Sequence, residues 1–127
     1  MASFWHFWGP VALGGALGSL ARYHVGRLVG LAWGRLFPLG TWIINVSGSF
    51  AIGLTAALAA RHVLAPAALQ LTETGFIGAY TTFSTFSYET VRLVEQRLWR
   101  TAAANLLLSA GAGLAAAGGG LAAGGWR

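Results

Sequence analysis

The chain has 127 residues, of which 56% are hydrophobic and only 9% are charged. Soluble globular domains carry about 25% charged residues, so this chain has too little charge to cover a soluble surface. It contains no Cys, which excludes a small secreted scaffold held by disulfides. At about 20 apolar residues per bilayer crossing, the length suits four membrane spans with short connections. We therefore expect the lipid bilayer to be its environment.

The net charge is +5, and all eight basic residues are Arg. They are scattered singly along the chain, whereas a nucleic-acid interface gathers its basic residues into a patch or stripe. Single Arg residues between long apolar runs are typical of charges that flank membrane spans. We therefore predict no nucleic-acid partner.

The apolar runs predict one membrane domain, residues 1–127, that is entirely α-helical. Its four spans are expected at about residues 8–31, 39–60, 66–94 and 101–123. Pro66 at the start of the third span suits the first turn of a helix. Small residues four apart predict places where helices approach closely: Gly14 with Gly18, Gly26 with Gly30, and Gly120 with Gly124.

The third span is too long for a single straight crossing, and its middle is rich in hydroxyl groups and glycine. Between Gly75 and Glu89 it reads GFIGAYTTFSTFSYE. Polar, Gly-containing backbone at bilayer depth is tolerated only where it is buried in protein or lines a water-filled cavity. We predict a helix break near residues 78–82. The alternative is a continuous helix whose Ser and Thr side chains bond back to their own turn.

Two ionisable residues lie within the predicted spans. Arg22 is about midway along the first span, one helical turn after Gly18, and a charge at that depth marks a functional site by default. Its side chain could instead extend to the membrane surface or cap a helix end. Glu89 follows the predicted break and could pair with Arg22 or with exposed backbone groups.

Polar side chains also recur on single faces of three spans. These pairs are Asn45 with Ser49, Thr82 with Thr85, Ser84 with Ser87, Phe83 with Phe86, and Asn105 with Ser109. Amide and hydroxyl donors can replace the hydration shell of a small anion, and an aromatic ring presents a positive edge. The same donors could instead bind helices together. Neither a transition-metal site nor a hydrolytic triad can be assembled from this set, so we predict no enzyme.

Two segments carry a family resemblance. The segments Gly40-Thr41-x-x-x-Asn45-x-x-Gly48-Ser49-Phe50-x-x-Gly53 and Gly75-Phe-Ile-Gly78-x-x-Thr81-Thr-Phe-Ser-Thr-Phe-Ser87-x-Glu89 resemble the Fluc (CrcB-type) fluoride channel family. Gly18-x-x-x-Arg22-Tyr23 fits it too. The length and the four-span layout match over essentially the whole chain, and the Thr-Thr-Phe-Ser-Thr-Phe-Ser run is the specific signal.

The resemblance implies an antiparallel, dual-topology homodimer in the inner membrane, in which the partner is a second copy of the chain. Two fluoride pathways would follow the subunit interface. The expected pathway residues are Asn45, Thr82, Phe83, Ser84, Thr85, Phe86 and Ser109, with Arg22, Glu89 and Asn105 as further pathway or architectural residues. A structural sodium ion would be held by the backbone carbonyls of Gly78 and Thr81. A Tyr occurs in some relatives at the position of Asn105.

The function implied is passive, fluoride-selective export down the electrochemical gradient. A proton-coupled multidrug transporter of similar size would need an acid deep in the first span, which carries Arg22 and no acid. A non-transporting membrane scaffold is the other alternative. Arg residues at 27, 35, 92, 97 and 100 flank one side of the predicted spans, and those at 61 and 127 flank the other. That bias favours outside termini, although the count becomes nearly even if Arg27 and Arg92 are membrane-embedded, as dual topology requires.

Overall fold

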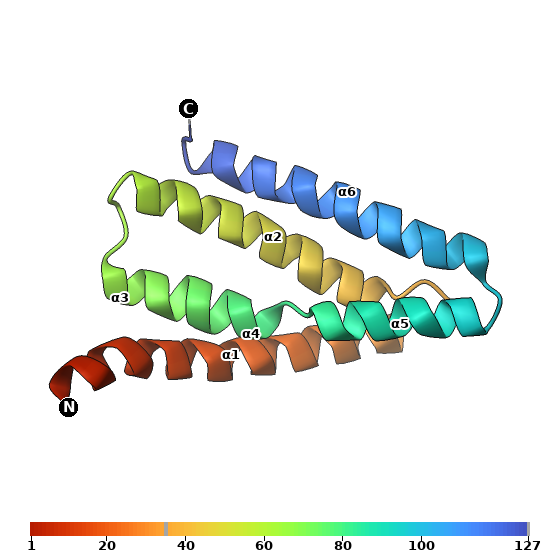
Figure 1. The fold of residues 1–127 in the computed structure, drawn as a ribbon, viewed down its shortest axis with the longest axis horizontal. Coiled ribbons are helices and arrows are strands. Elements are labelled where there is room, and N and C mark those ends of the chain that lie inside the picture. Colours follow the sequence, from red (N-terminus) through yellow and green to blue (C-terminus); the bar gives the residue numbers. More distant parts are fainter. Residues whose placement is uncertain (35, 127) are drawn as a thin grey trace.

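The structure is a computed structural model that describes residues 1–34 and 36–126. Its elements in chain order are α1 (Ala2–Ala32), α2 (Leu39–Ala60), α3 (Pro66–Leu69), the π-helix η1 (Gln70–Ile77), α4 (Gly78–Tyr80), α5 (Phe83–Glu95) and α6 (Trp99–Ala123). The all-helical prediction is therefore confirmed for the residues described. The segments α3, η1, α4 and α5 follow one another along a single line, so the chain forms four helical stretches (Figure 1).

Helices α2 and α6 are long and apolar enough to cross a membrane. Within this chain, only 22% of the most apolar part of α2 is buried, and for α6 the figure is 6%. Large apolar side chains such as Leu107 and Leu114 are correspondingly exposed, at 74% and 77%. Apolar surface on this scale is covered by lipid or by another protein chain rather than by water.

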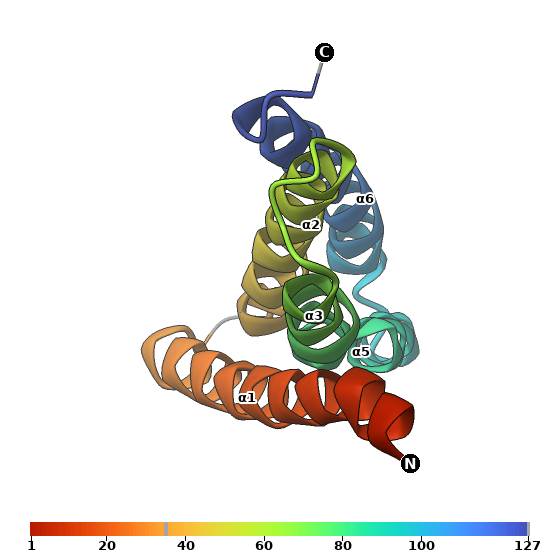
Figure 2. The same cartoon turned by 90° about the vertical axis from the view of Figure 1, so that its left-hand side faces the viewer.

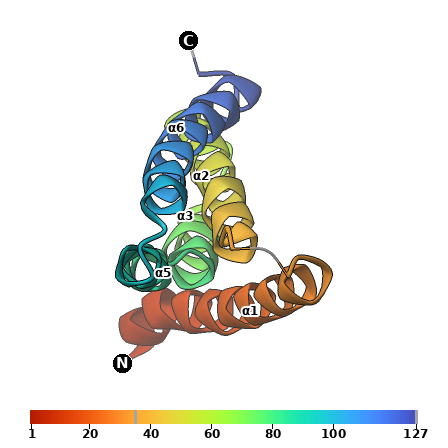
Figure 3. The ribbon, with the colours of Figure 1, turned by 90° about the vertical axis from the view of Figure 1, so that its right-hand side faces the viewer.

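The four helical stretches form two pairs. Helix α2 lies beside α6, and α1 lies against the line from α3 to α4 (Figure 1). The views along the bundle show α1 crossing under α3 and α5, while α2 and α6 extend away on the other side (Figures 2 and 3). Both chain ends lie at one end of the molecule, as an even number of crossings requires (Figure 1).

The α2–α6 pair is held by direct backbone contact. A Cβ atom added to Gly53 would collide with the carbonyl of Ala117, and one added to Gly120 would collide with the carbonyl of Phe50. Such close approach maximises dispersion contacts between helices in lipid. Arg61 completes the pair at one end, because its Nη1 donates a 3.0 Å hydrogen bond to the carbonyl of Gly124 at the end of α6.

The predicted small-residue contacts are found at two of the three pairs. Gly14 and Gly18 on α1 face the η1 backbone, where added Cβ atoms would collide with the carbonyls of Leu71 and Phe76 respectively. The Gly120 and Gly124 pair packs on α2. The third pair, Gly26 and Gly30, makes no such close backbone contact. Nothing lies within 4 Å of a Cβ placed on Gly30, and a Cβ on Gly26 would meet only the Ile44 side chain, at 3.8 Å.

The α2–α6 contact yields a stability prediction. Gly120→Ala should lower the free energy of unfolding by about 1–3 kcal/mol, because the backbone of α2 cannot yield to the added methyl group. The control is Gly118→Ala on the same helix, where nothing lies within 4 Å and removing a helical glycine should be neutral or mildly stabilising. Thermal unfolding of the purified protein in detergent measures both. Equal melting temperatures for the two variants would contradict the packing described.

Candidate functional site at the helix break

The third helical stretch is interrupted at two residues. Helix α4 ends at Tyr80, and Thr81 and Thr82 are extended, with φ −76°, ψ 157° and φ −147°, ψ 120°. Helix α5 then begins at Phe83, with Thr82 as its N-cap, whose hydroxyl accepts a 3.1 Å hydrogen bond from the Thr85 N–H. The predicted break is therefore confirmed, and the continuous-helix alternative is wrong.

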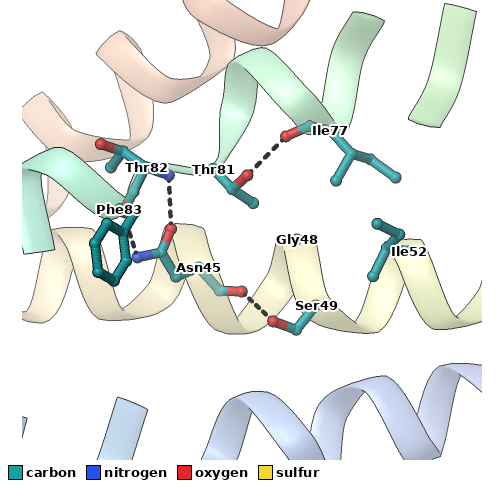
Figure 4. A pocket seen from close by; sticks show the side chains of 8 residues that line it. All are labelled: Asn45, Gly48, Ser49, Ile52, Ile77, Thr81, Thr82 and Phe83. Atoms are coloured by element: carbon teal, nitrogen blue, oxygen red, sulfur yellow. Dashed lines mark hydrogen bonds between the residues drawn. The ribbon is translucent and has the colours of Figure 1, made fainter. Parts of the chain in front are cut away.

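The side chain of Asn45 on α2 holds the extended segment at Thr82. Asn45 Nδ2 donates to the Thr82 carbonyl, and the Thr82 N–H donates to Asn45 Oδ1, both at 2.9 Å (Figure 4). In an uninterrupted α-helix the Thr82 N–H would bond to the carbonyl of Gly78, four residues back. Asn45 thus takes over that donor, satisfies both backbone groups of Thr82, and leaves the Gly78 carbonyl without its helical partner.

The neighbouring residue, Thr81, is held from the opposite side by α1. Arg22 Nη1 donates to the Thr81 carbonyl at 3.3 Å. Glu89 makes a different contact, because its Oε1 accepts a 2.9 Å hydrogen bond from the hydroxyl of Thr41 on α2. Glu89 therefore pairs neither with Arg22 nor with exposed backbone groups, the two partners considered from the sequence. Arg22 bonds to a backbone carbonyl instead. The break is therefore fastened by one side chain from α1 and one from α2.

A cluster of hydroxyl groups surrounds the start of α5. The Thr82 hydroxyl lies 3.0 Å from that of Thr85 and 3.3 Å from that of Ser84. Thr82 is buried, whereas Ser84 and Thr85 are exposed in the subunit. Three of the predicted pathway hydroxyls are therefore neighbours, and two of them face outward.

The two predicted aromatic residues lie together on α5. The rings of Phe83 and Phe86 have their centroids 5.9 Å apart, with planes tilted by 45°. Phe83 is 80% exposed, and Phe86 is half-buried. An apolar ring as exposed as that of Phe83, beside a polar break, is suited to contact with something beyond this subunit.

The break is bordered by two pockets. The first has a volume of about 300 Å³ and is lined by Asn45, Gly48, Ser49, Ile52, Ile77, Thr81, Thr82 and Phe83 (Figure 4). The second, of about 510 Å³, includes Arg22, Arg27, Thr41 and Glu89 in its lining, and Thr85 as well. Thr82 lines both pockets, so the extended segment is the wall between them.

The polar residues of α6 are placed elsewhere. Asn105 is 1% exposed, and its Nδ2 donates a 2.9 Å hydrogen bond to the Thr90 hydroxyl of α5. The Ser109 hydroxyl donates to Asn105 Oδ1 at 3.4 Å. Asn105 therefore joins α6 to α5, and Ser109 bonds to Asn105 within α6. Neither residue lines the pockets beside Asn45.

Two residues of α2 extend the predicted set. Thr41 binds Glu89, and Ser49 lines the first pocket, with its hydroxyl donating to the carbonyl of Asn45 at 2.8 Å. Positions 41, 45 and 49 are four apart, so all three occupy one face of the helix. The spacing of four residues that pairs Asn45 with Ser49 also places Thr41 on the same helix face. This spacing was the sequence signal that could have added Thr41 to the predicted site.

Comparison with known proteins places the chain in a family. The profile described as "CrcB-like protein, Camphor Resistance (CrcB)" matches residues 10–121. A protein of Acidobacterium capsulatum is 54% identical over 93 residues, which cover 72% of this chain and 74% of that protein. One of Geobacter metallireducens is 51% identical over 100 residues, covering 78% and 81%.

A protein of Alteromonas mediterranea is 45% identical over 107 residues, which cover 84% of each chain. All three are named "Fluoride-specific ion channel FluC". These names describe ion channels, which are membrane proteins and not enzymes, in agreement with the sequence analysis. By the profile match and by these identities, the chain belongs to the CrcB-like family.

Proposed function

We propose that this chain forms a passive, fluoride-selective channel that lets fluoride leave the cytoplasm through the inner membrane. Its relatives are named "Fluoride-specific ion channel FluC", and this name supports the ion and the channel. The observation that carries the proposal is the arrangement at the break, where Asn45 holds Thr82 extended beside a pocket lined by neutral donors and by Phe83. The second pocket, on the other side of Thr82, provides an approach from the opposite direction.

The chemistry of this lining suits a small anion. Neutral N–H and O–H groups can replace hydration water without the trapping that a fixed positive charge would cause. Asn45 Nδ2 carries two hydrogens, and one of them remains after its bond to Thr82. Ring edges of Phe83 and Phe86 add a positive electrostatic surface. We assign the pathway to Asn45, Thr82, Ser84 and Thr85 together with these two rings.

The residues that join helices have a supporting role in this proposal. Asn105, which accepts a hydrogen bond from Ser109 on the same helix, fastens α6 to α5 at Thr90. Glu89 fastens α5 to α2 at Thr41. They hold the start of α5 and the face of α2 in register. Arg22 acts on the break from the third direction, through the Thr81 carbonyl.

The direction of transport follows from acid–base chemistry. Hydrogen fluoride is a weak acid that crosses membranes as a neutral molecule and ionises in a near-neutral cytoplasm, where the anion accumulates. An inside-negative potential then drives the anion outward. A passive pathway is therefore sufficient for fluoride resistance.

We infer that a second, antiparallel copy completes the site. The first pocket is open, and Phe83 beside it is 80% exposed. A two-fold related subunit would cover this surface and supply a second, equivalent pathway. Of the Arg residues that bear on dual topology, Arg61 binds the end of α6, and Arg35 and Arg127 lie outside the described residues.

A structural sodium ion at the dimer centre is part of the proposal. Backbone carbonyls freed by a broken helix are suitable ligands for a hard cation. Gly78 fits this role, because it is exposed and the Thr82 N–H is diverted from its carbonyl to Asn45. The Thr81 carbonyl has ligand capacity too, since it has two lone pairs and Arg22 occupies one of them. The ion would cross-link the two breaks.

The function is tested by efflux from liposomes that contain the purified protein. Fluoride should leave the vesicles rapidly once a potassium ionophore balances the charge, and chloride should be retained. A fluoride electrode and a chloride electrode measure the two ions on the same preparation. Absence of fluoride flux, or equal flux of the two ions, would refute the proposal.

Asn45 is the most informative single residue for flux. Asn45→Asp should lower fluoride flux at least about a hundredfold, because a negative charge about 4 Å from the ion opposes it by ~4 kcal/mol at an effective dielectric constant of 20. It also removes the Nδ2 donor to the Thr82 carbonyl. The control is Thr55→Ala on the same helix, whose hydroxyl bonds only within α2 and whose loss should leave flux unchanged. Full flux in Asn45→Asp would exclude this residue from the pathway.

The aromatic pair yields a second flux prediction. Phe83→Ile and Phe86→Ile keep an apolar side chain but remove the positive ring edge. Each should lower fluoride flux about tenfold, which corresponds to ~1.4 kcal/mol. Phe7→Ile in the first turns of α1, far from the break in sequence, is the matched control. Wild-type rates in both α5 variants would show that the rings do not act on the ion.

A further inference from the structure

Arg22 occupies an unusual position for a charged side chain of a membrane-spanning helix. It is half-buried, and its Nη1 reaches the Thr81 carbonyl in the middle of the bundle instead of extending to a membrane surface. Gly18, one turn earlier on α1, faces the carbonyl of Phe76 at backbone contact distance. The close approach of α1 at Gly18 therefore brings the next turn, with Arg22, directly onto the break.

Arg22 forms no salt bridge with an acid among the residues that the structure describes. Among residues 1–34 and 36–126 the ion pair that the structure shows is Arg92 with Glu95, at 3.7 Å. Glu89 lines the same pocket as Arg22, but it binds Thr41. A guanidinium group keeps its charge at any accessible pH. The broken backbone therefore has a permanent positive charge hydrogen-bonded to one of its carbonyls.

A bound cation and this guanidinium would share the same electron-rich groups. Thr81 is an expected sodium ligand, and its carbonyl already accepts from Arg22. A like charge close by disfavours a charged group. A site that includes this carbonyl would therefore hold sodium less tightly with the Arg22 guanidinium present than without it.

We propose that Arg22 is a built-in cation of the helix break, which competes with sodium at the Thr81 carbonyl and so sets the sodium affinity of the dimer. This inference rests on the sodium site of the proposed function. When sodium is absent, the Arg22 hydrogen bond alone holds the Thr81 carbonyl. When sodium is present, the ion shares this carbonyl against the repulsion of the guanidinium and joins two subunits. Removal of the charge should make the protein bind sodium more tightly.

The test is a sodium titration of thermal stability with the purified wild-type protein and three variants. Ionic strength is held constant with N-methylglucamine chloride, a cation too large for a carbonyl site. Arg22→Gln should lower the sodium concentration at half-maximal stabilisation by about tenfold or more. Arg22→Lys, which keeps the charge, should stay within about threefold of wild type. Arg100→Gln, an exposed Arg at the start of α6, should shift it less than about twofold.

The outcomes separate this inference from the proposed function. An unchanged or raised midpoint in Arg22→Gln, with the dimer intact by size-exclusion chromatography, would overturn the competition. If Arg22→Gln does not fold, sodium is titrated into wild-type protein carrying ¹³C-labelled Arg side chains, with the Arg22 signal assigned from Arg22→Lys. Sodium should then shift the Arg22 guanidinium signal and leave that of Arg100 in place, and an unmoved Arg22 signal would also overturn it. A wild-type protein that transports fluoride but shows no sodium dependence would overturn the sodium site and the competition, and leave the fluoride channel standing.

Discussion

The pair of hydrogen bonds between the Asn45 side chain and the backbone of Thr82 is the constraint on which the rest of the structure depends. An interrupted helix in a bilayer exposes N–H and C=O groups that lipid cannot satisfy. A carboxamide offers one donor and one acceptor side by side, so it can satisfy both groups of a single extended residue. Asn45 does so, and the Thr82 hydroxyl then caps α5.

This constraint links features that look independent in the sequence. The Thr82 N–H that bonds to Asn45 is the one that would have closed the turn on Gly78. The Asn45–Thr82 interaction therefore frees the Gly78 carbonyl on the α4 side of the break. On the α5 side it positions the start of the helix, where the hydroxyl cluster around Thr82 and the two phenylalanine rings lie. The proposed cation site and the proposed anion pathway are two results of the same diverted hydrogen bond. Arg22 acts on the adjacent carbonyl of Thr81, which brings a third helix to the same point.

Much of this could be predicted because the patterns are local. A polar, Gly-containing stretch within a long apolar run predicts a break, and the i, i+3 spacing of Phe83 and Phe86 predicts their ring contact. The partners of Arg22 and Glu89 could not be predicted, since they come from elements 59 and 48 residues away in the chain. Asn105 was predicted as a pathway or architectural residue, and its partner could not be predicted either, since its amide is buried against Thr90 of a neighbouring helix.

The sequence by itself determined that this chain is a small helical membrane protein of the CrcB-like family, with a polar interruption in its third helical stretch. Composition and periodicity are sufficient for the helical membrane fold and its interruption, because they show how much charge is present and which positions share a face. The family follows from the match to related sequences. Only the tertiary structure decided which groups satisfy the interruption. Helix packing selects the partners there: Gly18 lets α1 approach closely enough for Arg22 to reach Thr81, and the position of α2 presents Asn45 to Thr82. The distances between these partners are set by how the helices pack against one another. The spacing of residues along the sequence does not contain that information.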